Sequence, residues 1–164
     1  MKDKKRMAAG YILLALTVAA AAFVFSNSLK PANASSAESS RLLIHVNSFF
    51  SQLGLKPISE NLLRKTAHFC EFGMLGILAS STGAMFSGAY SAASLPSLRR
   101  RGFFISFGVS VACAVCDETI QYFVPGRACR VTDMLIDSAG ALCGLAAVLA
   151  FCAAIRVRRR RRRN

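Results

Sequence analysis

The sequence of 164 residues has little charge outside a few short blocks, and it has no tryptophan. Charged residues make up 18% of the chain, whereas hydrophobic residues make up 54% and the mean hydropathy is +0.42. A chain of single-domain size with this composition is too apolar for an ordinary soluble domain. We therefore expect its partner to be the lipid bilayer.

Acidic residues are also scarce, with eight Asp and Glu against 21 Lys and Arg. The positive charges are not spread over a surface that could follow a phosphate backbone, because they gather in residues 2–6, 99–101 and 156–163. This arrangement argues against nucleic acid as a partner, although the formal net charge is +13.

A second CxxC pair is absent. Cys113 and Cys116 have the spacing of a metal or redox pair, but a structural zinc site of this kind needs two such pairs. Most of the six cysteines fall in apolar runs, where Cys behaves as a small hydrophobic residue. A disulfide between Cys70 and Cys129 is geometrically conceivable, and we do not expect it.

Four apolar runs are long enough to cross a bilayer, which takes about 20 residues at 1.5 Å each. We expect spans at residues 7–25, 66–86, 103–124 and 131–155, the second following an N-cap at Ser59. The fold class predicted is all-α, an integral membrane bundle of four helices in a single domain over residues 1–164.

The first run has a competing interpretation as a cleaved signal peptide, since a basic stretch precedes it and Ala32-Asn33-Ala34 resembles a cleavage site. However, its 19 uncharged residues exceed the roughly 7–15 of a signal peptide, and the Ala pair lies well past its end. We expect this span to be retained.

The distribution of Lys and Arg predicts the orientation. With four spans, the segments on the side of the chain ends carry 14 of these residues, in groups of four, three and seven, whereas the opposite loops carry seven. The positive-inside rule then places both termini in the cytoplasm of a multi-pass cell-membrane protein. The tail of residues 156–164 becomes a cytoplasmic anchor that attracts anionic lipid.

The outer loop at residues 26–65 contains one amphipathic stretch. Its apolar side chains recur at helical spacing: Leu42, Leu43, Val46, Phe49, Phe50 and Leu53. We expect an interfacial helix with this stripe dipped into the membrane surface. A helix packed over the bundle is the alternative.

Most of the scarce acidic residues lie within the expected spans, and one histidine accompanies them. These residues are His68, Glu71, Asp117, Glu118, Asp133 and Asp137. A charged side chain costs about 2.5 kcal/mol or more at the bilayer centre, so such residues are candidates for function. All of them occupy the span ends that the charge distribution assigns to the outer face.

Helical spacing places these residues on shared stripes. The stripes are Arg64, His68 and Glu71; Ser106, Ser110, Ala114, Asp117 and Gln121; and Asp133, Asp137, Gly140 and Gly144. The small residues favour close helix packing, so we expect the polar groups to face one another and not the lipid. Pairing between buried charges, in a scaffold without a site, is the simpler alternative.

Two chemistries fit the cluster, and the residues leave both open. A divalent metal held by His68 and Glu71 together with Asp117 or Asp133 would polarise a phosphoryl or carbonyl group and activate water. Alternatively, Arg127 and Arg130 would bind an anionic headgroup while the acidic side chains and His68 hydrogen-bond it or move a proton. The catalytic candidates are His68, Glu71, Asp117, Glu118 and Asp133, and the ligand-binding candidates are Lys65, Gln121, Arg127, Arg130 and Asp137.

Three motifs together carry a family resemblance. They are Lys65-x-x-His68-Phe69-x-Glu71, then Asp117-Glu118-x-x-Gln121-x-Phe123-x-Pro125-Gly126-Arg127, then Asp133 with Gly140-Ala141-x-x-Gly144. In this combination and spacing, the chain resembles the VanZ-like family of bacterial membrane proteins, most strongly over residues 64–144. It departs from the family at Phe72, where Tyr is usual, and at Asp137, where Asn is common.

The resemblance implies a VanZ-like membrane domain that acts at the cell envelope, since the founding member of the family is associated with teicoplanin resistance. Glycopeptides act at the outer membrane face on cell-wall precursors and their lipid carriers. A lipid-linked precursor or an anionic lipid headgroup is therefore the expected ligand. The alternative is a membrane-embedded hydrolase or transferase, with or without a divalent metal, that acts on a lipid-linked substrate.

Overall fold

The computed structural model describes residues 2–89 and 96–161, and every regular element in these ranges is a helix. The helices are α1 (Lys2–Ser28), α2 (Ala32–Gln52), α3 (Glu60–Phe86), α4 (Pro96–Tyr122) and α5 (Val131–Arg161). Four of them, all but α2, are long and apolar enough to cross a membrane. The all-α prediction with four membrane spans is confirmed, and the chain is a multi-pass membrane protein.

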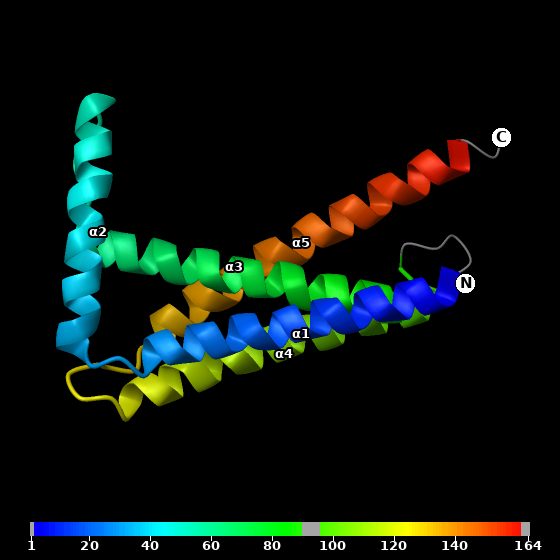
Figure 1. Cartoon of the computed structure of the whole chain (residues 1–164), viewed down its shortest axis with the longest axis horizontal. Helices are drawn as coiled ribbons and strands as arrows, with labels where there is room; N and C mark the ends of the chain where they lie inside the picture. The colour runs from blue at the N-terminus through cyan, green and yellow to red at the C-terminus, as the bar shows by residue number, and fades with distance from the viewer. Residues whose placement is uncertain (1, 90–95, 162–164) are drawn as a thin grey trace.

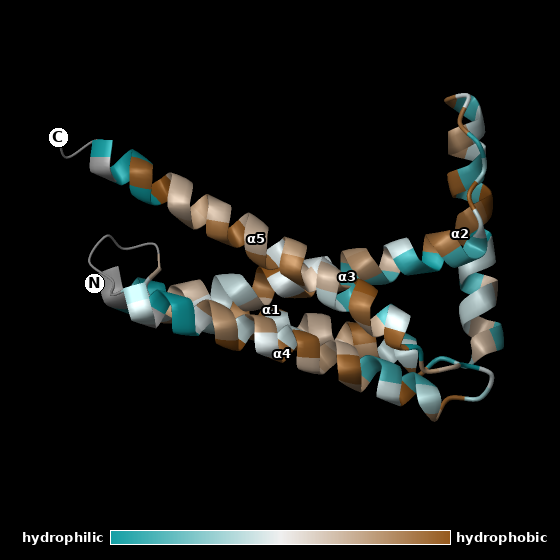
Figure 2. Ribbon diagram, turned by 180° about the vertical axis from the view of Figure 1, so that it is seen from behind, coloured by the Kyte–Doolittle hydropathy of each residue, from teal (hydrophilic) through white to brown (hydrophobic). Residues whose placement is uncertain are grey.

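The four long helices run lengthwise, and α2 lies across one end of them (Figure 1). We call this end, which includes the α4–α5 turn at residues 123–130, the α2 end. The start of α1 and the last turns of α5 lie at the opposite end, which we call the basic end (Figure 1). Hydrophobic residues dominate the middle of the long helices, and hydrophilic residues gather toward both ends (Figure 2).

The helices extend further than expected at several boundaries. α2 begins at Ala32, directly after Pro31, so the Ser-rich stretch before the amphipathic stripe is also helical. A serine in an exposed helix lowers helix stability by only about 0.5 kcal/mol relative to alanine, so a short Ser-rich stretch can still be helical. α4 begins at Pro96 and ends at Tyr122, two residues before the expected limit, and α5 continues past 155. Part of the expected linker, residues 90–95, lies outside the described residues.

The N-terminus of α3 is capped as predicted. The Ser59 hydroxyl oxygen accepts a hydrogen bond from the backbone N–H of Leu62 at 3.2 Å. This bond satisfies one of the backbone donors that a helix leaves unpaired at its start. It also fixes the place where α3 enters the bundle beside α2.

α3 is the centre of the bundle, and its most extensive contacts are with α5. The two helices cross through small residues, because a Cβ added at Gly76 would meet the backbone of Ala141, and one at Gly144 would meet the backbone of Gly73. The glycine stripe predicted for α5 therefore does mediate close packing. Its partner is α3 more than α4, the neighbour in sequence.

Candidate functional site

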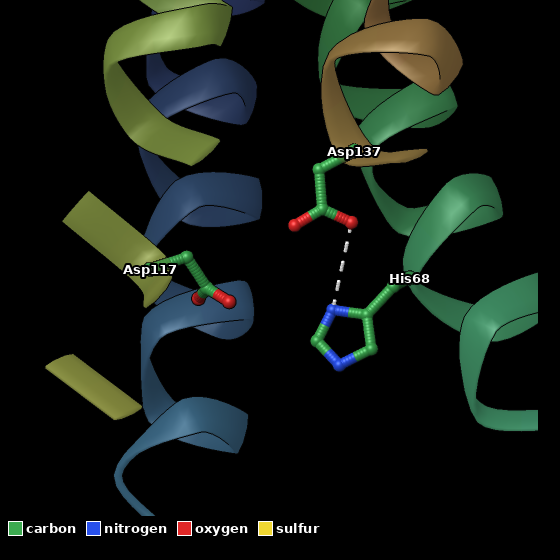
Figure 3. A group of neighbouring side chains, drawn as sticks. All are labelled: His68, Asp117 and Asp137. Carbon is green, nitrogen blue, oxygen red and sulfur yellow. Dashed lines mark ion pairs between the residues drawn. The ribbon is translucent and has the colours of Figure 1, made fainter. Parts of the chain in front are cut away.

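Three ionisable side chains from three helices meet at the α2 end. His68 of α3, Asp117 of α4 and Asp137 of α5 point toward one another (Figure 3). One potential ligand atom from each residue lies within 4.8 Å of those from the other two. Asp117 and Asp137 are fully buried, whereas the His68 side chain is 23% exposed. The structure thus brings together side chains that lie up to 69 positions apart in the sequence.

Asp117 is held in place by two donors. The Ser28 hydroxyl donates to Asp117 Oδ1 at 2.6 Å, and the Gln121 side-chain amide donates to Asp117 Oδ2 at 2.9 Å. Ser28 is the last residue of α1, so this buried pair ties α1 to α4. Sequence reasoning missed Ser28, because a serine just past an apolar run looks like a loop residue.

Asp137 has no comparable partner. Its Oδ1 lies 3.8 Å from His68 Nδ1, within the range of an ion pair but too far for a hydrogen bond. Within the described part of the chain, neither Asp137 oxygen has a hydrogen-bond partner, nor does His68 Nδ1. Buried polar atoms without partners are rare and costly, so this pair of side chains is the least satisfied part of the cluster.

The two glutamates face other partners. Glu71 Oε1 accepts a hydrogen bond from the Asn27 side-chain amide at 3.2 Å, which links α3 to the end of α1. Glu118 Oε2 accepts from the backbone N–H of Arg130 at 2.8 Å, just before α5 begins. Glu71 was expected as the third metal ligand beside His68 and Asp117. The structure turns the Glu71 carboxyl toward Asn27 of α1, and it places an Asp137 oxygen within 4.8 Å of His68 and Asp117.

A cavity of about 500 Å³ opens beside the cluster. His68 and Asp137 line its wall, together with most of the residues expected to bind a ligand. The predicted ligand-binding residues in the wall besides Asp137 are Lys65, Gln121, Arg127 and Arg130, and Arg64 and the catalytic candidate Asp133 line it as well. A smaller cavity of about 180 Å³ shares Arg64, His68 and Arg127 and also reaches Glu71. Both cavities are lined by cationic and acidic side chains, and the Lys and Arg residues outnumber the Asp and Glu residues by one in each.

Arg127 has a structural task as well. Its guanidinium donates from Nε to the carbonyl oxygen of Lys30 at 3.0 Å and from Nη2 to that of Asn27 at 3.1 Å. The Asn27 carbonyl also accepts from the backbone N–H of Lys30 at 3.2 Å, and Lys30 itself follows α1, so these bonds join the α4–α5 turn to the end of α1. Burial lowers the pKa of Arg127, and the positive charge of Arg64 adds to that lowering. An anion between the two guanidinium groups would relieve their repulsion.

Lys65 and Asp133 form a looser pair on the rim of the cavity. Lys65 Nζ lies 3.7 Å from Asp133 Oδ1, and both side chains are about one-third exposed, at 34% and 29%. Exposed pairs of this kind contribute little to stability, typically about 0–1 kcal/mol. The pair therefore adds little to the stability of the bundle.

The cysteines play no part in this cluster. All six are free, including Cys70 and Cys129, so the disulfide that we did not expect is not formed. Phe72, the departure from the usual Tyr, is fully buried in an apolar cluster with Val24, Leu75 and Ala114. A phenylalanine leaves no unpaired hydroxyl in that setting.

Comparison with known proteins gives one match. The family model described as VanZ/LLP1 matches residues 11–153, which is most of the chain and includes most of α1, the cavity residues and the α3–α5 crossing. No curated protein and no solved structure matches the chain.

Proposed function

We propose, because this chain belongs to the VanZ/LLP1 family, that it binds an anionic cell-envelope ligand in the α2-end cavity and so contributes to teicoplanin-type tolerance. At the level of the family, the chain is a membrane protein linked to glycopeptide resistance. The lining of the cavity supports the ligand class. Arg64, Lys65, Arg127 and Arg130 line a space large enough for a phosphate-bearing headgroup, and they outnumber the three acidic residues of the same wall.

The main support for this proposal is that His68 and Asp137 line the cavity and form no hydrogen bond with each other. Groups that serve only to hold helices together satisfy one another, as the Thr17 and Thr82 hydroxyls do at 3.2 Å. His68 and Asp137 instead keep donor and acceptor capacity for a ligand. A lipid-linked cell-wall precursor or an anionic lipid headgroup has the matching phosphate chemistry.

The proposal includes an orientation. The excess of Lys and Arg at the basic end supports a cytoplasmic location for both termini, so the cavity faces outward at the cell membrane. α1 is retained in this arrangement, because Asn27 and Ser28 contact the site acids Glu71 and Asp117. α2 then lies along the outer interface with its apolar stripe toward the lipid.

The test is a drug-susceptibility assay with teicoplanin and vancomycin in a strain that depends on this protein for tolerance. His68→Ala should abolish tolerance, because it removes the only histidine of the cavity wall. His45→Ala, the same change at the other histidine of the chain, exposed on α2, should leave tolerance intact. Protein amounts in membranes are matched by immunoblot.

Equal tolerance in the two histidine variants would contradict the proposal. Glu118→Gln and Asp133→Asn extend the test to other residues of the polar cluster. If neither these changes nor His68→Ala alters tolerance, the polar residues serve only as a scaffold.

A second candidate is a hydrolase or transferase that acts on a lipid-linked substrate at the same place. The observation that favours it is the convergence of an imidazole and two buried carboxyl groups beside a cavity that four Lys and Arg residues line. In this case His68 or Asp137 would exchange a proton with water or the leaving group. Phosphate release from a lipid pyrophosphate by the purified protein, lost in His68→Ala, would distinguish catalysis from binding.

A further inference from the structure

We propose that His68, Asp117 and Asp137 bind one divalent transition-metal ion of the zinc class. The three residues come from α3, α4 and α5, and one nitrogen and two oxygen atoms converge within 4.8 Å (Figure 3). Zinc sites that do chemistry commonly have three protein ligands and leave a fourth position open. His68 and Asp137 line the large cavity, so the open position faces it.

The unpartnered oxygen atoms of Asp137 are independent evidence for a bound cation. Its side chain is completely buried, yet both oxygens lack a hydrogen-bond partner within the described residues. The facing atom, His68 Nδ1, also lacks one. A carboxylate is an acceptor only, and a deprotonated imidazole nitrogen is an acceptor too, so a cation between them satisfies both.

Charge supports a divalent ion. Two aspartates and a neutral imidazole carry a total charge of −2, which one divalent ion cancels. Full compensation matters at a buried position in a membrane helix bundle, because an unpaired charge there is strongly disfavoured. A mixed nitrogen and oxygen ligand set suits zinc and its first-row neighbours better than calcium or magnesium, which prefer oxygen alone.

The neighbours of Asp117 have the arrangement expected of outer-shell residues. Ser28 and Gln121 donate one hydrogen bond to each of its oxygens, and Gln121 also reaches the Ser28 hydroxyl at 3.3 Å. Such bonds orient a ligating carboxylate and are typical of metal centres. They leave further lone pairs on both oxygens for an ion.

The distances allow the site to form by side-chain movement. Ligand atoms around one tetrahedral zinc ion lie about 3.4 Å apart, given bonds of about 2.1 Å. His68 Nδ1 and Asp137 Oδ1 are already 3.8 Å apart. The three side chains therefore draw together on binding, while the helices keep their places.

The ion would deepen the proposed function by taking an oxygen of the anionic ligand at its open position. Arg64 and Arg127 would then bind the remaining oxygens. This consequence rests on the proposed function, whereas the ion site itself rests only on the three side chains. The test below uses the metal alone, so the two ideas fail separately.

The test measures metal bound to the full-length protein in detergent or nanodiscs. The protein is stripped with a chelator, exposed to Zn²⁺, freed of excess metal and analysed by mass spectrometry for zinc per chain. We expect one ion per chain in the wild type and less than about one-tenth of that in His68→Ala and Asp137→Ala. Asp137→Asn keeps an oxygen ligand without the charge and should weaken binding at least about tenfold.

Two matched controls keep the result specific. Asp133→Asn changes a carboxylate one turn away on α5, and Glu71→Gln changes the glutamate one turn from His68 on α3. Both should retain one ion per chain. Cobalt in place of zinc identifies the ligand atoms by absorption. A site of nitrogen and oxygen ligands shows visible d–d bands, whereas cobalt bound by any of the six cysteines would add a sulfur-to-metal charge-transfer band.

The proposal is overturned if the wild type binds no zinc, since His68 and Asp137 then form a simple ion pair. It is equally overturned if His68→Ala and Asp137→Ala keep their zinc, or if the control variants lose it to the same extent. Size-exclusion profiles and circular dichroism show whether each variant is folded. If the alanine variants do not fold, the zinc content of the near-isosteric Asp137→Asn variant decides the result.

Discussion

The two ends of the bundle satisfy their buried polar groups in different ways. Toward the basic end, buried hydroxyls bond the backbone of their own helix one turn back, as Thr82 does with Leu78 and Ser110 with Ser106. Some of them also reach another helix, as Ser106 does with Ala79. At the α2 end, carboxyls and an imidazole accompany such groups. Asp117 has partners in Gln121 of its own helix and Ser28 of α1, Glu118 has the backbone N–H of Arg130, and Asp137 has no hydrogen-bond partner among the described residues.

The difference follows from what each group donates and accepts. A hydroxyl has a proton to give and finds a free lone pair on a carbonyl oxygen within its own helix. A carboxylate only accepts, and the N–H groups inside a helix are already used. Polar residues near the basic end can thus serve packing alone, whereas those at the α2 end need another helix, a cation or a ligand.

The largest effect is expected at the crossing of α3 and α5, on which both ends depend. Gly76→Leu should destabilise the protein by about 3 kcal/mol or more, because its side chain would collide with the backbone of Ala141. Gly108→Leu is the control, since a Cβ at Gly108 meets nothing within 4 Å. Thermal unfolding in detergent measures both. Similar melting temperatures for the two variants would mean that the helices do not cross as described.

A smaller effect separates two arginines of the α2 end. Arg127→Ala should lower the free energy of unfolding by about 2 kcal/mol, because two carbonyl groups at the end of α1 lose a charged donor. Arg64→Ala should change it by less than about 0.5 kcal/mol, since the structure gives its side chain no comparable bond. Denaturant titration of both variants is the measurement. If Arg127→Ala lowered the free energy of unfolding as little as Arg64→Ala, the two bonds of Arg127 would not stabilise the fold, and its charge would serve only to bind a ligand.

The next effect compares two hydroxyls of α1 that belong to the two regions. Ser28→Ala should cost about 1 kcal/mol of stability and weaken zinc binding about 10- to 100-fold, since Asp117 loses a donor. Thr17→Val removes the 3.2 Å contact with Thr82 and should cost about 0.6 kcal/mol, with zinc binding unchanged. Competition with a calibrated chelator gives the affinities. Equal zinc affinity in the two variants would break the distinction between the regions.

The smallest effect lies outside the bundle. Lys30→Ala removes an ion pair with Glu38 at 2.7 Å in which both side chains are exposed by more than one-third. Its effect on the free energy of unfolding should be below about 0.5 kcal/mol. A loss above about 1 kcal/mol in the same titration would mean that α2 braces the bundle through this pair.

Much of this architecture could be predicted from the sequence. The apolar runs predict the four long helices, and the stripe of Ser106, Ser110 and Ala114 leading to Asp117 predicts the buried face of α4, all of which is buried in the structure. These features are local, since helical spacing alone decides which residues share a face.

The partners of each helix could not be predicted in the same way. Small residues occur on α3, α4 and α5, so the sequence does not say that Gly144 meets Gly73. Whether Glu71 or Asp137 lies beside His68 depends on this packing. Glu71 lies about 60° around α3 from His68 and faces α1, whereas Asp137 is brought to His68 by the α3–α5 crossing.

The most direct test of the difference between the two ends measures both melting temperature and teicoplanin tolerance in two variants, one from each end. His68→Ala should lose tolerance while its melting temperature stays near that of the wild type, because His68 has no hydrogen bond to lose at Nδ1. Ser106→Ala should melt a few degrees lower, through loss of its 2.9 Å bond to Ala79, and keep its tolerance. If tolerance instead falls in proportion to melting temperature in both variants, the polar groups of the α2 end serve the fold and not a ligand.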